Sequence, residues 1–240
     1  MKRHSKLIIG LTFSMLATGF AMEAHAEPVC ISITAEVASV NDQGGVLAGA
    51  INVGDVITGT YVYESTTPDT NSAPTVGDYQ HMTAPFGITL NAGGFVFRTD
   101  PNNVNFLVEI VNDHGNPASD NYLLRSDNNI FDVGSSSDNN ISWQLDDPTL
   151  AALSSEALPT VPPVLADWQS VFGLTIESGP FFDGFFIRSH VTSANLCSDT
   201  SPKKVAICHK PGLPAEKTIF VSKSAVPGHL GHGDALGKCP

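Results

Sequence analysis

Residues 30–37 read CISITAEV, and this short stretch predicts the class of fold. Apolar side chains alternate with polar ones in it, and the apolar set is Ile31, Ile33, Ala35 and Val37. Successive side chains of a β-strand point to opposite faces of the sheet. The alternation therefore predicts a strand with one buried face and one solvated face.

The same alternation recurs along the chain in short runs, which are separated by the Gly, Asn, Asp, Ser and Pro residues typical of turns. The runs are residues 54–65, 86–92, 94–100, 104–113, 121–126, 140–147 and 171–178. Helix is predicted in this part only for LAALSSEAL, residues 150–158, which end at Pro159. Many short strands with turn-rich connections predict an all-β protein, an antiparallel β-sandwich that is jelly-roll-like.

The strongest hairpin signal is PFFDGFFIRSHV at residues 180–191. Asp183-Gly184 is a dipeptide typical of two-residue turns with positive φ, and a pair of Phe residues flanks it on each side. We therefore expect two antiparallel strands that meet at this dipeptide.

Residues 1–26 are typical of a secretory signal peptide. Lys2, Arg3 and Lys6 precede an apolar run, and small residues stand at the cleavage site before Glu27. The run is shorter than the roughly 20 residues of a membrane-spanning helix, and no later segment is long and apolar enough to cross a bilayer. We expect cleavage near Ala26 and a secreted, periplasmic or cell-surface protein without an integral membrane segment.

Charge divides the rest of the chain into two parts. Residues 27–200 contain 21 acidic residues against three Arg, a net charge of −18, whereas residues 201–240 contain six Lys against two acidic residues, a net charge of +4. So abrupt a change predicts a boundary between an acidic β-sandwich domain (27–200) and a basic C-terminal module (201–240). The acidic domain would repel nucleic acid, so we expect no nucleic-acid partner.

Four cysteines lie beyond the predicted signal peptide, and an even number in an exported protein predicts disulfides. Three pairings are possible. We favour Cys30 with Cys197, which would tie the first strand of the sandwich to its last, and Cys208 with Cys239, which would close the module into a small disulfide-bonded unit.

The acidic domain lacks the common sequence motifs of hydrolases and nucleotide-binding proteins. Glu109, in the apolar run FLVEIV, is a candidate acid or base with a raised pKa, although a solvated sheet face is its commoner setting. Trp143 and Trp168 are candidates for stacking on sugar rings, although Trp is also an ordinary core residue. A carbohydrate-active enzyme remains an alternative function for the domain, because the paired carboxylates of such enzymes need no fixed spacing in the sequence.

Several loops of the domain group oxygen donors of the kind that calcium prefers. None has the spacing of an EF-hand, and ordinary turns in which Asp and Asn bind the backbone have the same composition. The candidate calcium ligands are Asp113, Asp120, Asp146 and Asp147.

The C-terminal module groups imidazole and carboxylate side chains, which are good ligands for zinc or copper. The candidates are His209, His229, His232 and Asp234. Three interpretations are open: thiolates and histidines around zinc, a disulfide-closed module whose His/Asp cluster binds metal, and a disulfide-closed module whose histidines bind only backbone groups. Export favours the two interpretations with a disulfide.

The module, with the pattern ICHKPG…KTIFV…GHLGHGDALGKC, resembles a short unit at the C-terminal end of many exported bacterial proteins. The domain, with GDVITGTYVYESTTPDTN and GDYQHM, resembles secreted bacterial β-sandwich proteins that often carry a C-terminal surface-sorting tail. This chain departs from the patterns at Leu213 and in carrying the Cys/His module where the sorting helix would be. The resemblance implies export and an all-β domain, and it implies no role for individual residues.

The leading functional hypothesis is an exported, non-enzymatic protein whose sandwich binds a surface or matrix component, either a glycan or a protein. The first alternative is a metal-binding protein that uses the His/Asp cluster of the module. The second is a carbohydrate-active enzyme on the sandwich.

Overall fold

The structure is a computed structural model that describes residues 28–134, 138–169, 173–179, 184–198, 205–222 and 225–239. In these residues the protein is nearly all β, which confirms the predicted antiparallel sandwich with a small disulfide-closed C-terminal module. One sheet has 11 strands and a second has three. The predicted signal peptide and Glu27 lie outside the described residues.

The large sheet is antiparallel throughout, with the spatial order β3-β6-β7-β9-β10-β11-β1-β2-β4-β5-β8. Its strands are β1 (Pro28–Asp42), β2 (Val56–Glu64), β3 (Val76–His81), β4 (Gly87–Ala92), β5 (Phe95–Thr99), β6 (Phe106–Gly115), β7 (Ala118–Ser126), β8 (Asn129–Phe131), β9 (Asn139–Asp147), β10 (Gly173–Ser178) and β11 (Phe185–Leu196).

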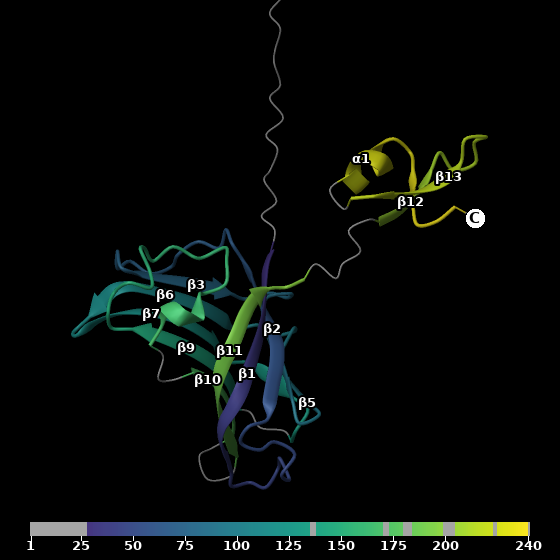
Figure 1. Ribbon diagram of the computed structural model, residues 1–240. Coiled ribbons are helices and arrows are strands. Elements are labelled where there is room, and N and C mark those ends of the chain that lie inside the picture. Colours follow the sequence, from purple (N-terminus) through teal and green to yellow (C-terminus); the bar gives the residue numbers. More distant parts are fainter. Residues whose placement is uncertain are drawn as a thin grey trace, which may run out of the picture.

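The long strands β1 and β11 pair along most of their length and form the spine of the sandwich (Figure 1). The sheet folds around this pair, so that strands on the β10 side face strands on the β2 side. Tyr61 of β2 and Tyr122 of β7 show this contact, because their buried hydroxyls lie 3.0 Å apart. Thr99 of β5 and Ser126 of β7 make a second contact of this kind, at 2.8 Å between hydroxyl oxygens.

The core contains the side chains that the alternating sequence pattern predicted to be buried. The apolar residues of CISITAEV are all buried in β1, and so are Tyr61 and Tyr63 of β2. Trp143 of β9 is also fully buried, with its ring 6.0 Å from that of Tyr61. Trp168 is partly buried against the same core. The core interpretation is therefore confirmed for Trp143.

The predicted helix at residues 150–158 is wrong. Within the described residues the helices are a 3-10 turn, η1 (Leu165–Asp167), and α1 (Val226–Gly231). Leu150 has a φ of 62°, which is incompatible with a right-handed helix, and the backbone N–H groups that follow bind carboxylates: Ala151 and Ala152 donate to Asp147, and Leu153 donates to Asp120. Tertiary hydrogen bonds therefore override the local helix propensity.

The hairpin prediction was correct for the strand after the dipeptide, which is β11, and wrong in its turn, whereas the strand expected just before Asp183 lies outside the described residues. β10 and β11 are antiparallel neighbours, but Phe185 pairs with Ser178, so residues 179–184 connect them. Asp183 lies outside the described residues, and Gly184 does not have a positive φ. A Cβ at Gly184 would lie 1.6 Å from the carbonyl oxygen of Ser178, so the absence of a side chain is required by the close approach of two backbones.

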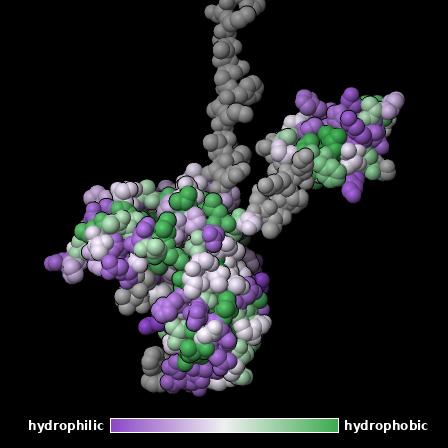
Figure 2. Space-filling model, in the orientation of Figure 1, coloured by the Kyte–Doolittle hydropathy of each residue, from purple (hydrophilic) through white to green (hydrophobic). Residues whose placement is uncertain are grey.

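The small sheet has the order β13-β12-β14, with β12 (Val205–His209) between β13 (Lys217–Val221) and β14 (Ala235–Leu236). Both favoured disulfides are present: Cys30 is bonded to Cys197, and Cys208 to Cys239. Apolar and hydrophilic residues both reach the surface of the module (Figure 2), and Phe220 is 55% exposed. The described part of the chain has no helix that is long and apolar enough to span a membrane.

Candidate functional site

The strongest cluster of chemically active side chains lies in the C-terminal module. His209 is the last residue of β12, and His229 lies in the last turn of α1. Asp234 follows a tight turn at Gly233, where the φ of 87° is one that side-chain-bearing residues rarely adopt. Three separate segments therefore bring one side chain each to the same point.

Asp234 is the centre of this cluster. Its Oδ2 accepts hydrogen bonds from Nδ1 of His209, at 2.8 Å, and from Nδ1 of His229, at 2.7 Å. Its Oδ1 accepts the backbone N–H of Lys210 at 3.0 Å. The side chain of Asp234 is only 3% exposed, whereas those of His209 and His229 are 29% and 27% exposed. The buried carboxylate thus holds two imidazoles that solvent still reaches.

The electrostatics keep this carboxyl ionised. The backbone N–H of Lys210, followed by the side chains of His209 and His229, holds the pKa of Asp234 well below its usual range. An ionised carboxylate only accepts hydrogen bonds, so each Nδ1 must carry the proton that it donates. Both histidines are therefore fixed as Nδ1–H tautomers, or as the doubly protonated form, while the cluster stays hydrogen-bonded.

The same three residues meet the requirements of a metal site. One ligand atom from each of His209, His229 and Asp234 lies within 4.8 Å of the others. Zinc binds imidazole nitrogen and carboxylate oxygen at about 2.0–2.2 Å, which places the ligand atoms of a tetrahedral site about 3.3 Å apart. The two contacts to Asp234 Oδ2 are 2.8 and 2.7 Å, so each Nδ1 lies about half an ångström closer to Oδ2 than in a tetrahedral zinc site.

His232, the fourth candidate ligand, is not part of this cluster. It is the C-cap of α1, where its backbone N–H binds carbonyl groups of the helix, and its side chain is exposed. α1 contains His229 but ends at Gly231, so His229 and His232 do not share a helix face. Ala225 is the N-cap of this helix.

The thiolate interpretation of the module is excluded by its disulfide. Cys208, Cys239 and Glu216 do bring three ligand atoms together. Both sulfur atoms are consumed by the bond between Cys208 and Cys239, however, and a metal needs the thiolate form. Of the two interpretations with a closed disulfide, the one in which the histidines bind only backbone groups is wrong for His209 and His229, which bind the side chain of Asp234. Metal binding by the His/Asp cluster stays a prediction.

The candidate calcium ligands of the sandwich are placed differently. Asp120 and Asp147 are buried cross-strand partners, and their oxygens accept backbone N–H groups of nearby loops. Asp146 points to the other face and accepts the side-chain amide of Gln144. Asp113 is exposed and donates its backbone N–H to Asp120. Within the described residues these four do not belong to a converging group of three ligands, and calcium binding there stays a prediction.

Glu109 has the raised pKa that its sequence context suggested. Burial raises the pKa of Glu109, and the negative charge of Asp78, its cross-strand partner on β3, raises it further. Sequence inspection did not single out Asp78. The alternation in GDYQHM could have found it, because burial of Tyr79 and His81 places Asp78 on the outer face beside Glu109.

The fold and the cluster define the class of protein: an all-β sandwich with a disulfide-closed module that carries two histidines on one buried aspartate. Comparison with models of protein families, with curated proteins and with solved structures found no match.

Proposed function

We propose that this protein binds a divalent transition-metal ion, zinc or copper, through His209, His229 and Asp234 of its C-terminal module. The observation that carries the proposal is the convergence of two partly exposed imidazoles on one buried, ionised carboxylate oxygen. The protein is exported and non-enzymatic in this proposal, and the sandwich carries the module.

The composition of the site selects the class of ion. Imidazole nitrogen suits zinc, copper and nickel, whereas calcium and magnesium require a shell of oxygen atoms. Three protein ligands also leave a fourth position for water or an external ligand. In the described part of the chain the ion-pair partners of Asp234 are the two histidines.

Metal binding would displace the hydrogen-bonded protons. Because Nδ1 of each histidine would bind the ion, the proton of the neutral imidazole would move to Nε2. The disulfide next to His209 supports the arrangement, because it fixes β12 to the C-terminal end of the module. Preorganised ligands reduce the entropy that is lost when the ion binds.

The test is a zinc titration of the complete exported protein, purified without added metal and stripped with a chelator. We expect about one ion per chain by calorimetry and elemental analysis. ¹⁵N NMR should show two histidines changing from the Nδ1–H to the Nε2–H tautomer. His229→Ala should weaken the affinity at least about 10-fold. His232→Ala is the matched control, because His232 lies three residues away and is exposed, and it should bind zinc as the parent does.

Fold integrity must be checked in both variants by intact mass of the non-reduced protein and by circular dichroism. The proposal is wrong if the parent binds no zinc or copper, or if the two variants lose affinity equally. Binding of calcium with preference over zinc would also contradict it.

A further inference from the structure

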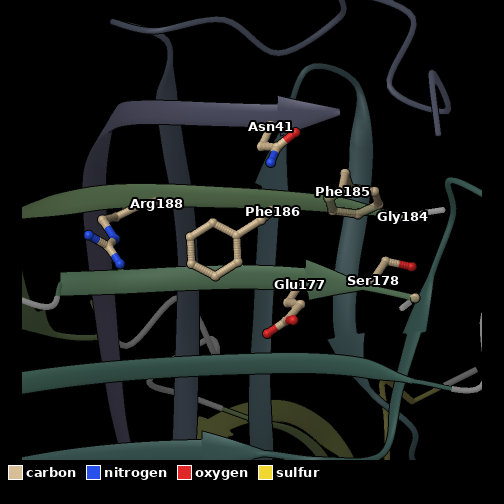
Figure 3. A pocket seen from close by; sticks show the side chains of 8 residues that line it. Asn41, Glu177, Ser178, Gly184, Phe185, Phe186 and Arg188 are labelled. Atoms are coloured by element: carbon tan, nitrogen blue, oxygen red, sulfur yellow. The ribbon is translucent and has the colours of Figure 1, made fainter. Parts of the chain in front are cut away.

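A separate feature lies on the outer face of the sandwich, where β10, β11 and β1 run side by side. A groove of about 260 Å³ opens there, and its polar and aromatic lining includes Asn41, Glu177, Phe186 and Arg188 (Figure 3). The volume is slightly below the range of about 300–1,000 Å³ for small-molecule sites. The groove therefore suits one small ring and its substituents.

The pairing register of the strands brings the lining residues of this groove together. Phe186 on β11 pairs with Asn41 on β1 and with Glu177 on β10, so the three side chains form one row across the outer face. Arg188 lies two residues along β11 and points to the same face. Phe185 and Ile187, which alternate with them, are buried in the core and hold the strand in place.

The aromatic ring is held in position by its neighbour. The guanidinium carbon of Arg188 lies 5.6 Å from the ring centre of Phe186, within the range of a cation–π contact. In Figure 3 the ring is seen face-on, between Arg188 and Glu177. Arg188 is exposed and Glu177 is half-buried, so solvent reaches both charged groups.

The lining matches the chemistry of a sugar ring. The C–H face of a pyranose is apolar and can pack on the ring of Phe186, while its hydroxyls both donate and accept hydrogen bonds. Glu177 offers an acceptor, Arg188 offers donors, and the amide of Asn41 offers both. An apolar platform with a few convergent polar groups is the usual design of a small-molecule site.

The net charge of the domain and the charges in the groove favour an uncharged ligand. Residues 27–200 carry a net charge of −18, which repels sulfated or uronic-acid glycans. Within the groove one carboxylate and one guanidinium offset each other, so an uncharged ligand meets no net charge. We infer that this groove binds a neutral saccharide, as a single ring or the end of a neutral polysaccharide. This inference is independent of the metal site.

The test is binding of the fluorescently labelled complete protein to an array of neutral gluco-, manno-, galacto- and xylo-oligosaccharides, with sulfated and uronic-acid glycans on the same array. We expect binding to at least one neutral series. Affinity for the best oligosaccharide should fall at least about 10-fold in Phe186→Ala, since loss of a stacking platform removes about 1.4 kcal/mol or more. Glu177→Gln should also weaken binding, because a charged acceptor becomes a neutral one.

Phe220→Ala is the matched control, since it removes an exposed Phe from the C-terminal module, and it should bind as the parent does. His229→Ala should also keep saccharide binding, which separates this inference from the metal proposal. The inference is overturned if no neutral saccharide binds, if only acidic glycans bind, or if Phe186→Ala and Glu177→Gln bind as the parent does.

Discussion

Asp120 on β7 and Asp147 on β9 are direct cross-strand partners, and both are completely buried in the sandwich. Two carboxylates in such positions would normally repel each other. Hydrogen bonds offset this repulsion: Asp147 accepts the N–H and hydroxyl of Thr149 and the N–H of Ala151. The pair therefore anchors the segment that follows β9.

The first prediction concerns Asp147. Asp147→Ala should lower Tm by roughly 5 °C or more, because the N–H groups of Thr149, Ala151 and Ala152 lose a buried acceptor that anchors their segment. The exposed Asp167→Ala should change Tm by much less and serves as the control. Differential scanning calorimetry is the measurement, and equal Tm values for the two variants would contradict the role assigned to Asp147.

The effect of Asp147 should depend on pH. The Thr149 hydroxyl and the N–H of Ala151 lower the pKa of Asp147 below its ordinary value. The stabilisation is therefore fully present above the unfolded-state pKa of about 3.9 and is lost as pH falls through the folded-state pKa. The difference in Tm between the parent protein and Asp147→Ala should be constant from pH 7 to 5 and shrink below about pH 4.

The sequence predicted much of the fold, because period-two alternation is a local property. CISITAEV became β1 with its apolar residues inside, and the alternating runs of the domain became strands. The helix at residues 150–158 was wrong, since Leu150 has a φ of 62° and the segment is held by carboxylates of β7 and β9. No local pattern contains such contacts.

The candidate metal ligands were likewise only partly predictable from the sequence. The sequence identified the correct residue types, yet His232, only two residues from Asp234, lies outside the cluster, whereas His209 belongs to it across a separation of 25 residues. The helix end at Gly231 and the turn at Gly233 decide which histidine faces the carboxylate. That choice depends on backbone geometry that residue spacing does not specify.

A second prediction concerns Glu109. Burial, and then Asp78, raises the pKa of Glu109, so the folded protein holds this proton more tightly than the unfolded chain does. Its ionisation therefore destabilises the fold as pH rises above the unfolded-state pKa of about 4.3. Glu109→Gln should raise Tm by about 1–3 °C at pH 7, a small value because the site is partly solvated, and should have less effect at pH 4.

Glu36→Gln is the control for this experiment, since Glu36 is an exposed residue of β1. It should change Tm little at either pH. A Glu109→Gln variant that was less stable than the parent protein at pH 7, with Glu36→Gln unchanged, would show that the carboxylate of Glu109 stabilises the fold instead.

A third prediction concerns the hydroxyls of Tyr61 and Tyr122, which form a buried hydrogen bond between the two halves of the sandwich. Burial raises the pKa of both residues well above the ordinary value, so both stay neutral. Tyr122→Phe should lower the free energy of unfolding by about 1–3 kcal/mol, because Tyr61 loses its partner in the core.

A double-mutant cycle measures this contact. The double variant Tyr61→Phe/Tyr122→Phe should lose less stability than the sum of the two single variants, since neither hydroxyl is then left without a partner. Urea unfolding at constant m-value gives the free energies. Strict additivity would mean that the two hydroxyls do not interact in solution.

The last prediction links the disulfide of the module to its metal site. Cys208 and Cys239 close a loop with a sequence separation of 31, and such a bond stabilises a fold by roughly 3–5 kcal/mol in the loop-entropy model. His209 is adjacent to Cys208, so loss of the bond should release β12 from the C-terminal end. The double variant Cys208→Ser/Cys239→Ser should bind zinc at least about 10-fold more weakly than the parent.

The matched control is Cys30→Ser/Cys197→Ser, which removes the disulfide between β1 and the end of β11. It should lower the Tm of the sandwich and leave zinc affinity unchanged, because these residues do not belong to the small sheet. Calorimetric titration and thermal unfolding of both double variants separate the two effects. If the control lost zinc affinity as strongly as Cys208→Ser/Cys239→Ser, the ion would depend on the sandwich as well as on the module, and the site assigned to His209, His229 and Asp234 would be incomplete.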